Sequence, residues 1–177
     1  MGIVMPDAAV RRVVFIAYDG LSLLDLAGPL ESLLAAGFGG LGADPYVYEC
    51  MVVSLKGGPV MTADGIELGT QSVRKLDRKP IDTIVVPGAF RVEDVLRQQA
   101  LIDWVRRRAG ECRRICSVCI GSFFLAAAGL LDGKRAATHW MHCGRLAELF
   151  PAVKVEPDAI FVRDGRLWTS AGGYQRN

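Results

Sequence analysis

The stretch Arg114-Ile-Cys-Ser-Val-Cys119-Ile-Gly-Ser122, followed by the apolar run 123–131, decides the fold of this sequence. Residues 113–118 have the composition of a short buried strand, and residues 121–128 favour a helix whose alanines permit close packing. A residue between such a strand and helix, with Gly two positions later, is typical of a nucleophile elbow. This is a strained turn that exposes one side chain at the carboxyl edge of a sheet. The pattern predicts that Cys119 occupies that turn.

The surroundings of this turn predict the chemistry of Cys119. The first amides of the helix that begins at Gly121, together with the helix dipole, favour an anion. The thiol is therefore expected to ionise more easily than a free cysteine and to be the most reactive of the five thiols. The alternative is a buried, inert cysteine, which is the commoner state of a cysteine in an apolar segment.

Composition indicates one globular domain over residues 1–177, because 51% of the residues are hydrophobic and 23% are charged. The net charge of +2 is too small to indicate a nucleic acid or an acidic membrane surface as partner. The basic run Arg106-Arg107-Arg108 closes a predicted helix, where cations are favoured. The longest apolar run is too short to span a membrane.

Five cysteines form an odd set with no secretory signal before them, which favours a reducing, cytoplasmic location: Cys50, Cys112, Cys116, Cys119 and Cys143. The spacing of Cys112, Cys116 and Cys119 matches no common zinc site, and only His139 and His142 could complete one. We expect no structural metal and no cofactor. Cys116-Ser-Val-Cys119 also has the C-x-x-C redox form, but Cys116 is expected inside the strand, so we favour the elbow.

Strands alternate with helices along the rest of the chain. Continuous apolar runs at 12–18 and 81–86 predict buried parallel strands, and hairpins are expected over 60–68 and 160–169. The other expected elements are strands at 46–55, 135–138 and 153–155 and helices at 23–36, 92–98, 101–108 and 140–150. This order predicts a mostly parallel sheet covered by helices on both faces.

Ligands of such sheets bind beyond the carboxyl ends of the strands. Asp19-Gly20, Pro87-Gly88 and Cys119 all follow predicted strands, so we expect them to meet at this edge. Asp25 begins a helix inside an apolar window, where burial of an acid is costly without a partner. A carboxylate that stabilises the helix dipole is the plainer alternative. His139 is either an ordinary, partly buried histidine or a base of the site.

Five motifs together resemble the ThiJ/PfpI superfamily over nearly the whole chain: Leu24-Asp-Leu-Ala-Gly-Pro29, Val86-Pro-Gly88, Ser117-Val-Cys-Ile-Gly121, Ala128-Gly-Leu-Leu-Asp-Gly133 and Ala137-Thr-His-Trp140. The resemblance implies the flavodoxin-like, class I glutamine amidotransferase-like fold, a three-layer α/β sandwich. The similarity is closer to the N-terminal domains of AraC-type transcription regulators, as Phe161-Val-Arg-Asp-Gly165 and Trp168-Thr-Ser-Ala-Gly172 extend it. The elbow and Asp25 also resemble those of isonitrile hydratases.

The resemblance implies a role for each candidate site residue. Cys119 matches the reactive cysteine of the superfamily, and Asp25 matches the acid that hydrogen-bonds its sulfur. Some members keep a histidine near the thiol, and His139 stands 20 positions after Cys119 (139 − 119). Gly88 matches the oxyanion-hole glycine, whose amide would act with that of Ile120. Three positions are therefore implied to bind the ligand or stabilise an oxyanion: Gly88, Ile120 and Gly121.

Ile120 departs from the pattern of the catalytic members. Peptidase-like members carry His directly after the cysteine, and Ile120 cannot take the thiol proton, which argues against a Cys–His peptidase. Isonitrile hydratases usually have Thr there, and Ile120 cannot donate its hydrogen bond. The departure argues against hydratase activity as well.

Two functions stay open. The first is a domain of an AraC-type regulator that senses a small molecule or oxidation, is not catalytic and forms a homodimer. Its helix-turn-helix units, which would bind DNA, would lie outside this chain. After Thr169 only eight residues remain (177 − 169), so we expect a domain without its final C-terminal helix. The second function is a stand-alone cysteine enzyme, either a hydratase or an amidase-like hydrolase.

Overall fold

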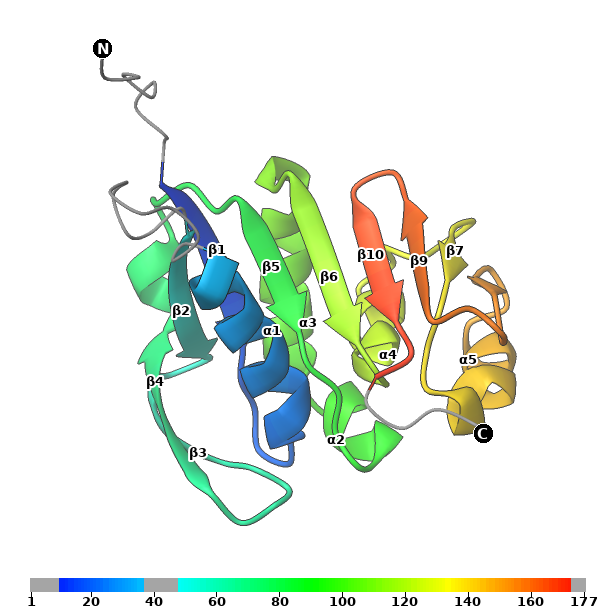
Figure 1. Ribbon diagram of the computed structural model, residues 1–177, viewed down its shortest axis with the longest axis horizontal. Coiled ribbons are helices and arrows are strands. Elements are labelled where there is room, and N and C mark those ends of the chain that lie inside the picture. Colours follow the sequence, from blue (N-terminus) through cyan, green and yellow to red (C-terminus); the bar gives the residue numbers. More distant parts are fainter. Residues whose placement is uncertain (1–9, 37–47, 173–177) are drawn as a thin grey trace.

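The computed structural model describes residues 10–36 and 48–172, and it shows an eight-stranded sheet between two layers of helices (Figure 1). The strand order is β3-β4-β2-β1-β5-β6-β10-β9. The strands from β4 to β10 in this order run parallel, and the edge strands β3 and β9 pair antiparallel with their neighbours. The mostly parallel sheet predicted from the sequence is confirmed. Its strands are β1 (Arg11–Ile16), β2 (Tyr48–Ser54), β3 (Gly58–Met61), β4 (Glu67–Ser72), β5 (Thr83–Val86), β6 (Arg114–Val118), β9 (Phe161–Asp164) and β10 (Leu167–Ser170).

Helices cover both faces of the sheet. In Figure 1, α1 (Leu23–Ala36) lies in front of the sheet, and α3 (Gln99–Arg108) and α4 (Gly121–Ala127) lie behind it. The short helix α2 (Val92–Leu96) lies near the carboxyl ends of the strands. None of the helices in the described segments is long and apolar enough to cross a membrane.

The centre of the core is formed by β1 and β5. The side chains of residues 13–16 are fully buried, and every residue of β5 is buried. Both strands are covered on two faces, which explains why their sequences are continuous apolar runs rather than alternating ones. Both predicted hairpins are confirmed, since β3 pairs with β4 and β9 with β10.

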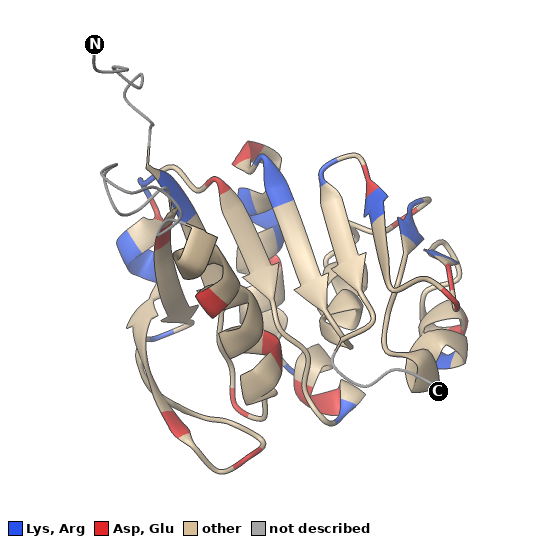
Figure 2. Ribbon diagram, viewed as in Figure 1, with Lys and Arg blue, Asp and Glu red and all other residues tan. Residues whose placement is uncertain are grey.

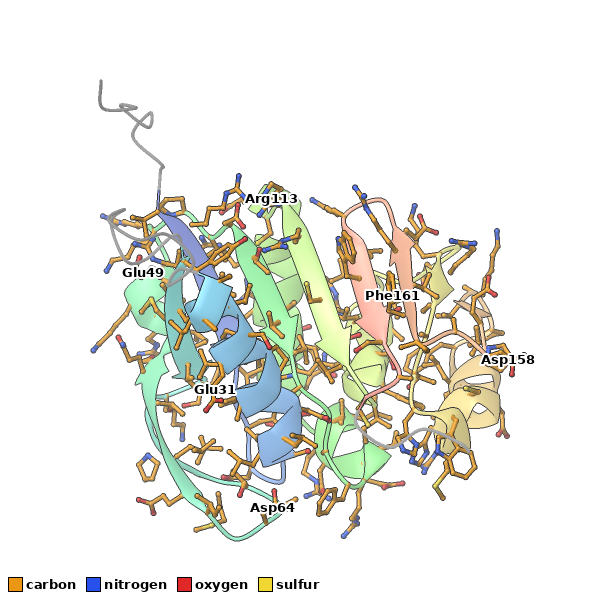
Figure 3. The ribbon with its side chains drawn as sticks, viewed as in Figure 1. Glu31, Glu49, Asp64, Arg113, Asp158 and Phe161 are labelled. Atoms are coloured by element: carbon orange, nitrogen blue, oxygen red, sulfur yellow. The ribbon has the colours of Figure 1, made fainter. Side chains whose placement is uncertain are left out.

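The strands β6 and β10 are buried on one face only. Ile115 and Leu167 are buried, whereas their neighbours Cys116 and Trp168 are partly exposed. In Figure 1 no helix of the described residues lies in front of these two strands, and Figure 3 labels Phe161 on the adjacent β9. The Phe161 ring is 62% exposed and stacks on Trp168. That the domain lacks a final covering helix stays a prediction.

Two segments differ from the sequence-based expectations. The helix predicted over 140–150 begins as a 3-10 turn (Trp140–His142), and α5 (Cys143–Leu149) starts after it, because His139 accepts the Met141 amide and caps that turn. The strand predicted at 135–138 is shorter. It forms β7 (Arg135–Ala136), which pairs with β8 (Lys154–Val155) in a separate two-stranded sheet. Residues 46 and 47 of the predicted second strand lie outside the described residues.

Candidate functional site

Cys119 lies in the turn between β6 and α4, where the sequence places it. Its φ is 55°, and within residues 10–36 and 48–172 it is the one non-glycine residue with a positive φ. This left-handed conformation costs roughly 1–2 kcal/mol for a residue with a Cβ atom, so the surroundings must hold it. The Cys119 amide donates to the Ser170 carbonyl oxygen at 3.0 Å, which ties the turn to the end of β10.

Two buried hydroxyl groups fix the carbonyl group of Cys119. Ser122 Oγ donates to Thr138 Oγ1 at 2.7 Å, and both oxygens lie 3.3 Å from the Cys119 carbonyl oxygen. Because Ser122 donates its hydroxyl proton to Thr138, the Thr138 hydroxyl is the donor to the Cys119 carbonyl oxygen. Ser122 is 0% and Thr138 is 2% exposed. Hydrogen bonds therefore hold both the amide and the carbonyl group of Cys119.

Glycines permit the close packing around the Cys119 side chain. A Cβ atom on Gly172 would lie 2.6 Å from Cys119 Cβ and 3.1 Å from its Sγ. A Cβ atom on Gly88 would lie 2.7 Å from Asp25 Oδ2 and 3.0 Å from Cys119 Cβ. On Gly121, a Cβ atom would overlap the Val86 carbonyl oxygen. These positions therefore exclude any side chain.

Asp25 lies in the first turn of α1 and is 5% exposed. Burial raises the pKa of Asp25 above its usual value, and hydrogen bonding from the Gly88 amide and Cys119 offsets only part of this rise. The Oδ2 atom is buried and has no hydrogen-bond partner within the described part of the chain. The structure thus places the acid beside the thiol, and it places the Gly88 amide against the acid.

The thiol of Cys119 has the opposite shift from the one that the sequence predicts. Burial, followed by the negative charge of Asp25, raises the pKa of Cys119 to about 12, and the Ile120 amide lowers it by less. The expectation of an easily ionised thiol is therefore wrong. That expectation rested on the amides and the dipole of the helix. Because α4 has only seven residues, its effect on the thiol pKa is smaller than the effect of burial. Asp25 is consequently the first of the two groups to ionise.

His139 and His142 line the same pocket as Asp25 and Cys119. His139 Nδ1 accepts the Met141 amide at 3.3 Å, and its ring stacks on Trp140. The two histidine rings are 5.8 Å apart. Burial lowers the pKa of both histidines, so both are neutral at pH 7. Neither ring hydrogen-bonds Cys119 in the described structure, so a base role for His139 stays a prediction.

A pocket of about 300 Å³ joins these groups at the carboxyl edge of the sheet. Its lining residues are Ser22, Asp25, Ala89, Phe90, Cys119, Ile120, His139, Met141 and His142. Four of the six predicted site residues therefore line one pocket. Of the other two, Gly88 packs against Asp25 and Cys119, whereas Gly121 packs against the backbone of Val86 and Pro87.

Asp19 and Gly20 do not join the pocket, although the sequence predicts that they meet Cys119 there. Asp19 Oδ1 accepts the Met61 amide, and the Gly20 amide donates to the Met61 carbonyl oxygen. Both residues therefore hold the β3–β4 hairpin. Across residues 10–36 and 48–172, no group of three or more His, Cys, Asp or Glu side chains is placed to hold a metal ion.

A strained cysteine turn with a buried acid beside it therefore lies at the edge of a flavodoxin-like sheet, and the sequence as a whole matches a family with this fold. Residues 11–176 match the DJ-1/PfpI family. The chain belongs to this family. The resemblance drawn from the five motifs is thereby confirmed.

Proteins of two functional kinds are similar to this chain. An isonitrile hydratase from Pseudomonas putida is 33% identical over 91% of the chain and 65% of its own length. The HTH-type transcriptional regulator GlxA from Rhizobium meliloti is 30% identical over 93% of the chain and 49% of its own length. The chain thus spans just under two thirds of the hydratase and about half of the regulator.

A solved DJ-1/PfpI structure confirms the fold. The crystal structure of a ThiJ/PfpI family protein from Pseudomonas syringae matches with a TM-score of 0.76 at 23% identity, covering 97% of this chain and 69% of that chain. The α/β architecture with a mostly parallel sheet is therefore that of the family.

Sequence reasoning missed three residues of this DJ-1/PfpI site. The sequence patterns assign no role to Gly172, Ser122 or Thr138. The glycine pair after the last strand was an available signal for a close backbone approach. No local sequence signal indicates the contact between Ser122 and Thr138, because residues 16 positions apart meet only through the tertiary fold.

Proposed function

We propose that this DJ-1/PfpI chain is the small-molecule-sensing domain of an AraC-type transcription regulator, with Cys119 facing the ligand. The observation that carries the proposal is the Cys119 thiol on the wall of a 300 Å³ pocket, without a hydrogen bond, within the described residues, to either of the two histidines that line it. A cysteine hydrolase needs an activated thiol beside a base, whereas binding needs only a shaped pocket with a few polar groups.

The similarity to the regulator GlxA supports the same proposal, since it extends over 93% of the chain. DNA would be bound by helix-turn-helix units outside this chain. We also propose a homodimer in the cytoplasm, on the strength of the family resemblance. Oxidation of Cys119 would be a second, slow input to the same site: the thiol lies at the pocket wall, but its raised pKa leaves little of the thiolate that oxidants attack.

A cysteine enzyme of the isonitrile hydratase or amidase type is the second candidate, and the contact between Asp25 and Cys119 favours it. The ionised Asp25 carboxylate can accept the thiol proton while the sulfur bonds to an electrophilic carbon, and can then return the proton to the substrate. The 33% identity to the isonitrile hydratase supports this alternative.

A thermal-shift screen of small metabolites tests the sensing proposal. A ligand at 100 times its Kd should stabilise the domain by about 2.7 kcal/mol, and this rise in Tm should shrink in Cys119→Ala and Asp25→Ala but not in Cys143→Ala. A ligand that stabilises all variants equally would place binding elsewhere. Turnover of an alkyl isonitrile or amide that Cys119→Ala abolishes would favour the enzyme.

A further inference from the structure

The pocket lining carries no positive charge at neutral pH among the described residues. Ala89, Phe90, Ile120 and Met141 contribute apolar surface, and Phe90 is 62% exposed at the rim. None of the described residues that line the pocket is Lys or Arg. Figure 2 shows the arginines of β1 and β6 at the amino ends of these strands, the end of the sheet away from the pocket.

The ionisable residues of the lining supply no positive charge either. The pKa of His139 and of His142 is lowered by burial, so both rings are neutral at pH 7. The Cys119 thiol is neutral, and the neighbouring Asp25 can only be neutral or negative. An anionic ligand would lose its hydration without gaining a cation, which is strongly unfavourable.

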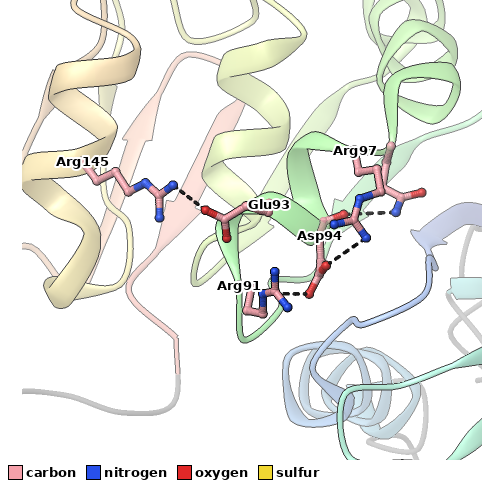
Figure 4. A network of polar contacts seen from close by, with 6 residues as sticks. Arg91, Glu93, Asp94, Arg97 and Arg145 are labelled. Atoms are coloured by element: carbon pink, nitrogen blue, oxygen red, sulfur yellow. Dashed lines mark hydrogen bonds and ion pairs between the residues drawn. The ribbon is translucent and has the colours of Figure 1, made fainter.

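One ion pair joins the two walls of the pocket. Phe90 precedes α2, which carries Glu93, and His142 precedes α5, which carries Arg145. Arg145 Nη2 and Glu93 Oε1 are 2.5 Å apart, and Figure 4 shows this contact between the two helices. Both charges lie near enough to His142 to shift its pKa, so the pair lies at the histidine side of the pocket. Neither residue lines the pocket, but Glu93 neutralises the positive charge of Arg145 beside the histidine side of the pocket.

We propose that the Cys119 pocket selects small uncharged ligands with an apolar body and excludes carboxylates, and that Glu93 sets this selectivity by neutralising Arg145. The small volume limits the ligand's size, since 300 Å³ is at the lower end for ligand pockets. The inference rests on the proposed function, because it assigns the ligand class of the same pocket.

A pair of alkylating reagents tests the ligand class at the sulfur itself. Iodoacetamide is uncharged and iodoacetate is anionic, and both react alike: the S–C bond forms, iodide leaves with the C–I bond, and buffer takes the thiol proton. The labelling rate of the Cys119 peptide is measured by mass spectrometry in the folded protein. The same peptide in urea-unfolded protein gives the intrinsic ratio of the two rates.

In the folded protein the preference for iodoacetamide should exceed the unfolded ratio by at least about tenfold, since like charges in a confined site repel strongly. Glu93→Gln frees Arg145 and should reduce this preference at least about threefold, whereas Arg145→Gln should not reduce it. Asp103→Asn is the matched control. It removes the same charge from another surface ion pair, with Arg106, and should leave the preference unchanged.

The possible outcomes test the ligand class and the pocket separately. Labelling of Cys119 by both reagents at the unfolded ratio overturns the uncharged class and leaves the pocket as a binding site. A preference that Glu93→Gln leaves unchanged overturns the role of Glu93. Failure of both reagents to label Cys119 in the folded protein at pH 10, where a thiol with a pKa of about 12 is still about 1% ionised, overturns the pocket itself, and with it the proposed function.

Discussion

Asp25 is a buried acid beside a buried thiol, and at the scale of single residues this proximity sets the ionisation of both groups. Burial disfavours either charge. The Asp25 carboxylate raises the pKa of the thiol, whereas the hydrogen bond from the thiol lowers the pKa of the acid. The pair therefore titrates in two coupled steps, with Asp25 losing its proton before Cys119. The thiol is protonated at neutral pH, as expected of a site that binds a ligand without using an activated nucleophile.

The raised pKa of Asp25 makes stability depend on pH. The folded state holds this proton more tightly than the unfolded state, so the stability it contributes is present at acid pH and is lost as pH rises through the folded pKa. Asp25→Asn should therefore be more stable than the parent at pH 7, by on the order of 1 kcal/mol. Urea unfolding at pH 7 and at acid pH measures the difference. A variant that is less stable at pH 7 would contradict the raised pKa of the buried carboxyl group.

Gly172 should tolerate no side chain because of its contact with Cys119. Gly172 and Gly165 both have positive φ, but an added Cβ meets Cys119 only at Gly172. Gly165→Ala should cost about 1 kcal/mol for the backbone alone, and Gly172→Ala about 2–3 kcal/mol more and disturb Cys119 labelling. Urea unfolding of the two variants compares them. Equal losses would show that the contact with Cys119 carries no energy.

The residues of the site were only partly predictable from the sequence. Cys119 and Asp25 could be predicted because each has a local sequence signal. Cys119 lies between a predicted strand and a predicted helix, and Asp25 is an acid in an apolar window. The direction in which the pKa of Cys119 is shifted could not be predicted, because burial of the thiol depends on how α1 and the end of β10 pack around the turn. The role of Gly172 likewise depends on a contact between residues 53 positions apart (172 − 119).

At the scale of elements, the parallel strands and the hairpins followed from their patterns, since buried runs and turn residues are local signals. The helix predicted over 140–150 was too long at its start, because the His139 side chain takes the Met141 amide and forms a separate turn. That turn carries two histidines to the pocket. The local departure from a regular helix therefore coincides with the site.

Thr138 connects the start of this segment to the cysteine turn, and its hydroxyl should be required there. Thr138→Val removes the donor to the Cys119 carbonyl and leaves the Ser122 hydroxyl without its short acceptor, at a cost of about 1–3 kcal/mol. Thr138→Ser keeps the hydroxyl and should restore most of the loss. Unfolding free energies and the Cys119 labelling rate measure both effects. Valine and serine variants that behave alike would mean that the hydroxyl does not hold the turn.

At the scale of the whole molecule, the charge is balanced and dispersed. The sequence has 21 basic and 19 acidic residues, and Figure 2 shows no continuous basic face in the view drawn. Ion pairs such as Arg113 with Asp82 and Arg12 with Glu49 further reduce the free positive charge. This surface suits a domain that senses a small molecule rather than one that contacts phosphates.

The chain alone should therefore show no specific DNA binding. Affinity for DNA rests on phosphate neutralisation by a concentrated basic surface, which the described surface does not present. Electrophoretic mobility shift at physiological salt, with promoter and random duplexes of equal length, measures it. Retention of the promoter duplex at lower protein concentration than the random one would contradict the expectation and place DNA contacts within this domain.

Both proposals depend on the coupling of Cys119 to Asp25, and a site-resolved titration measures it. The protein is labelled with iodoacetamide from roughly pH 7 to 10, and each cysteine peptide is quantified by mass spectrometry. The Cys119 rate should rise about tenfold per pH unit without a plateau, as a thiol with a pKa of about 12 requires. Asp25→Asn should label faster across this range, while Cys143 keeps its rate. A Cys119 rate that levels off below about pH 9, or that Asp25→Asn leaves unchanged, would show that the two groups are not a coupled pair.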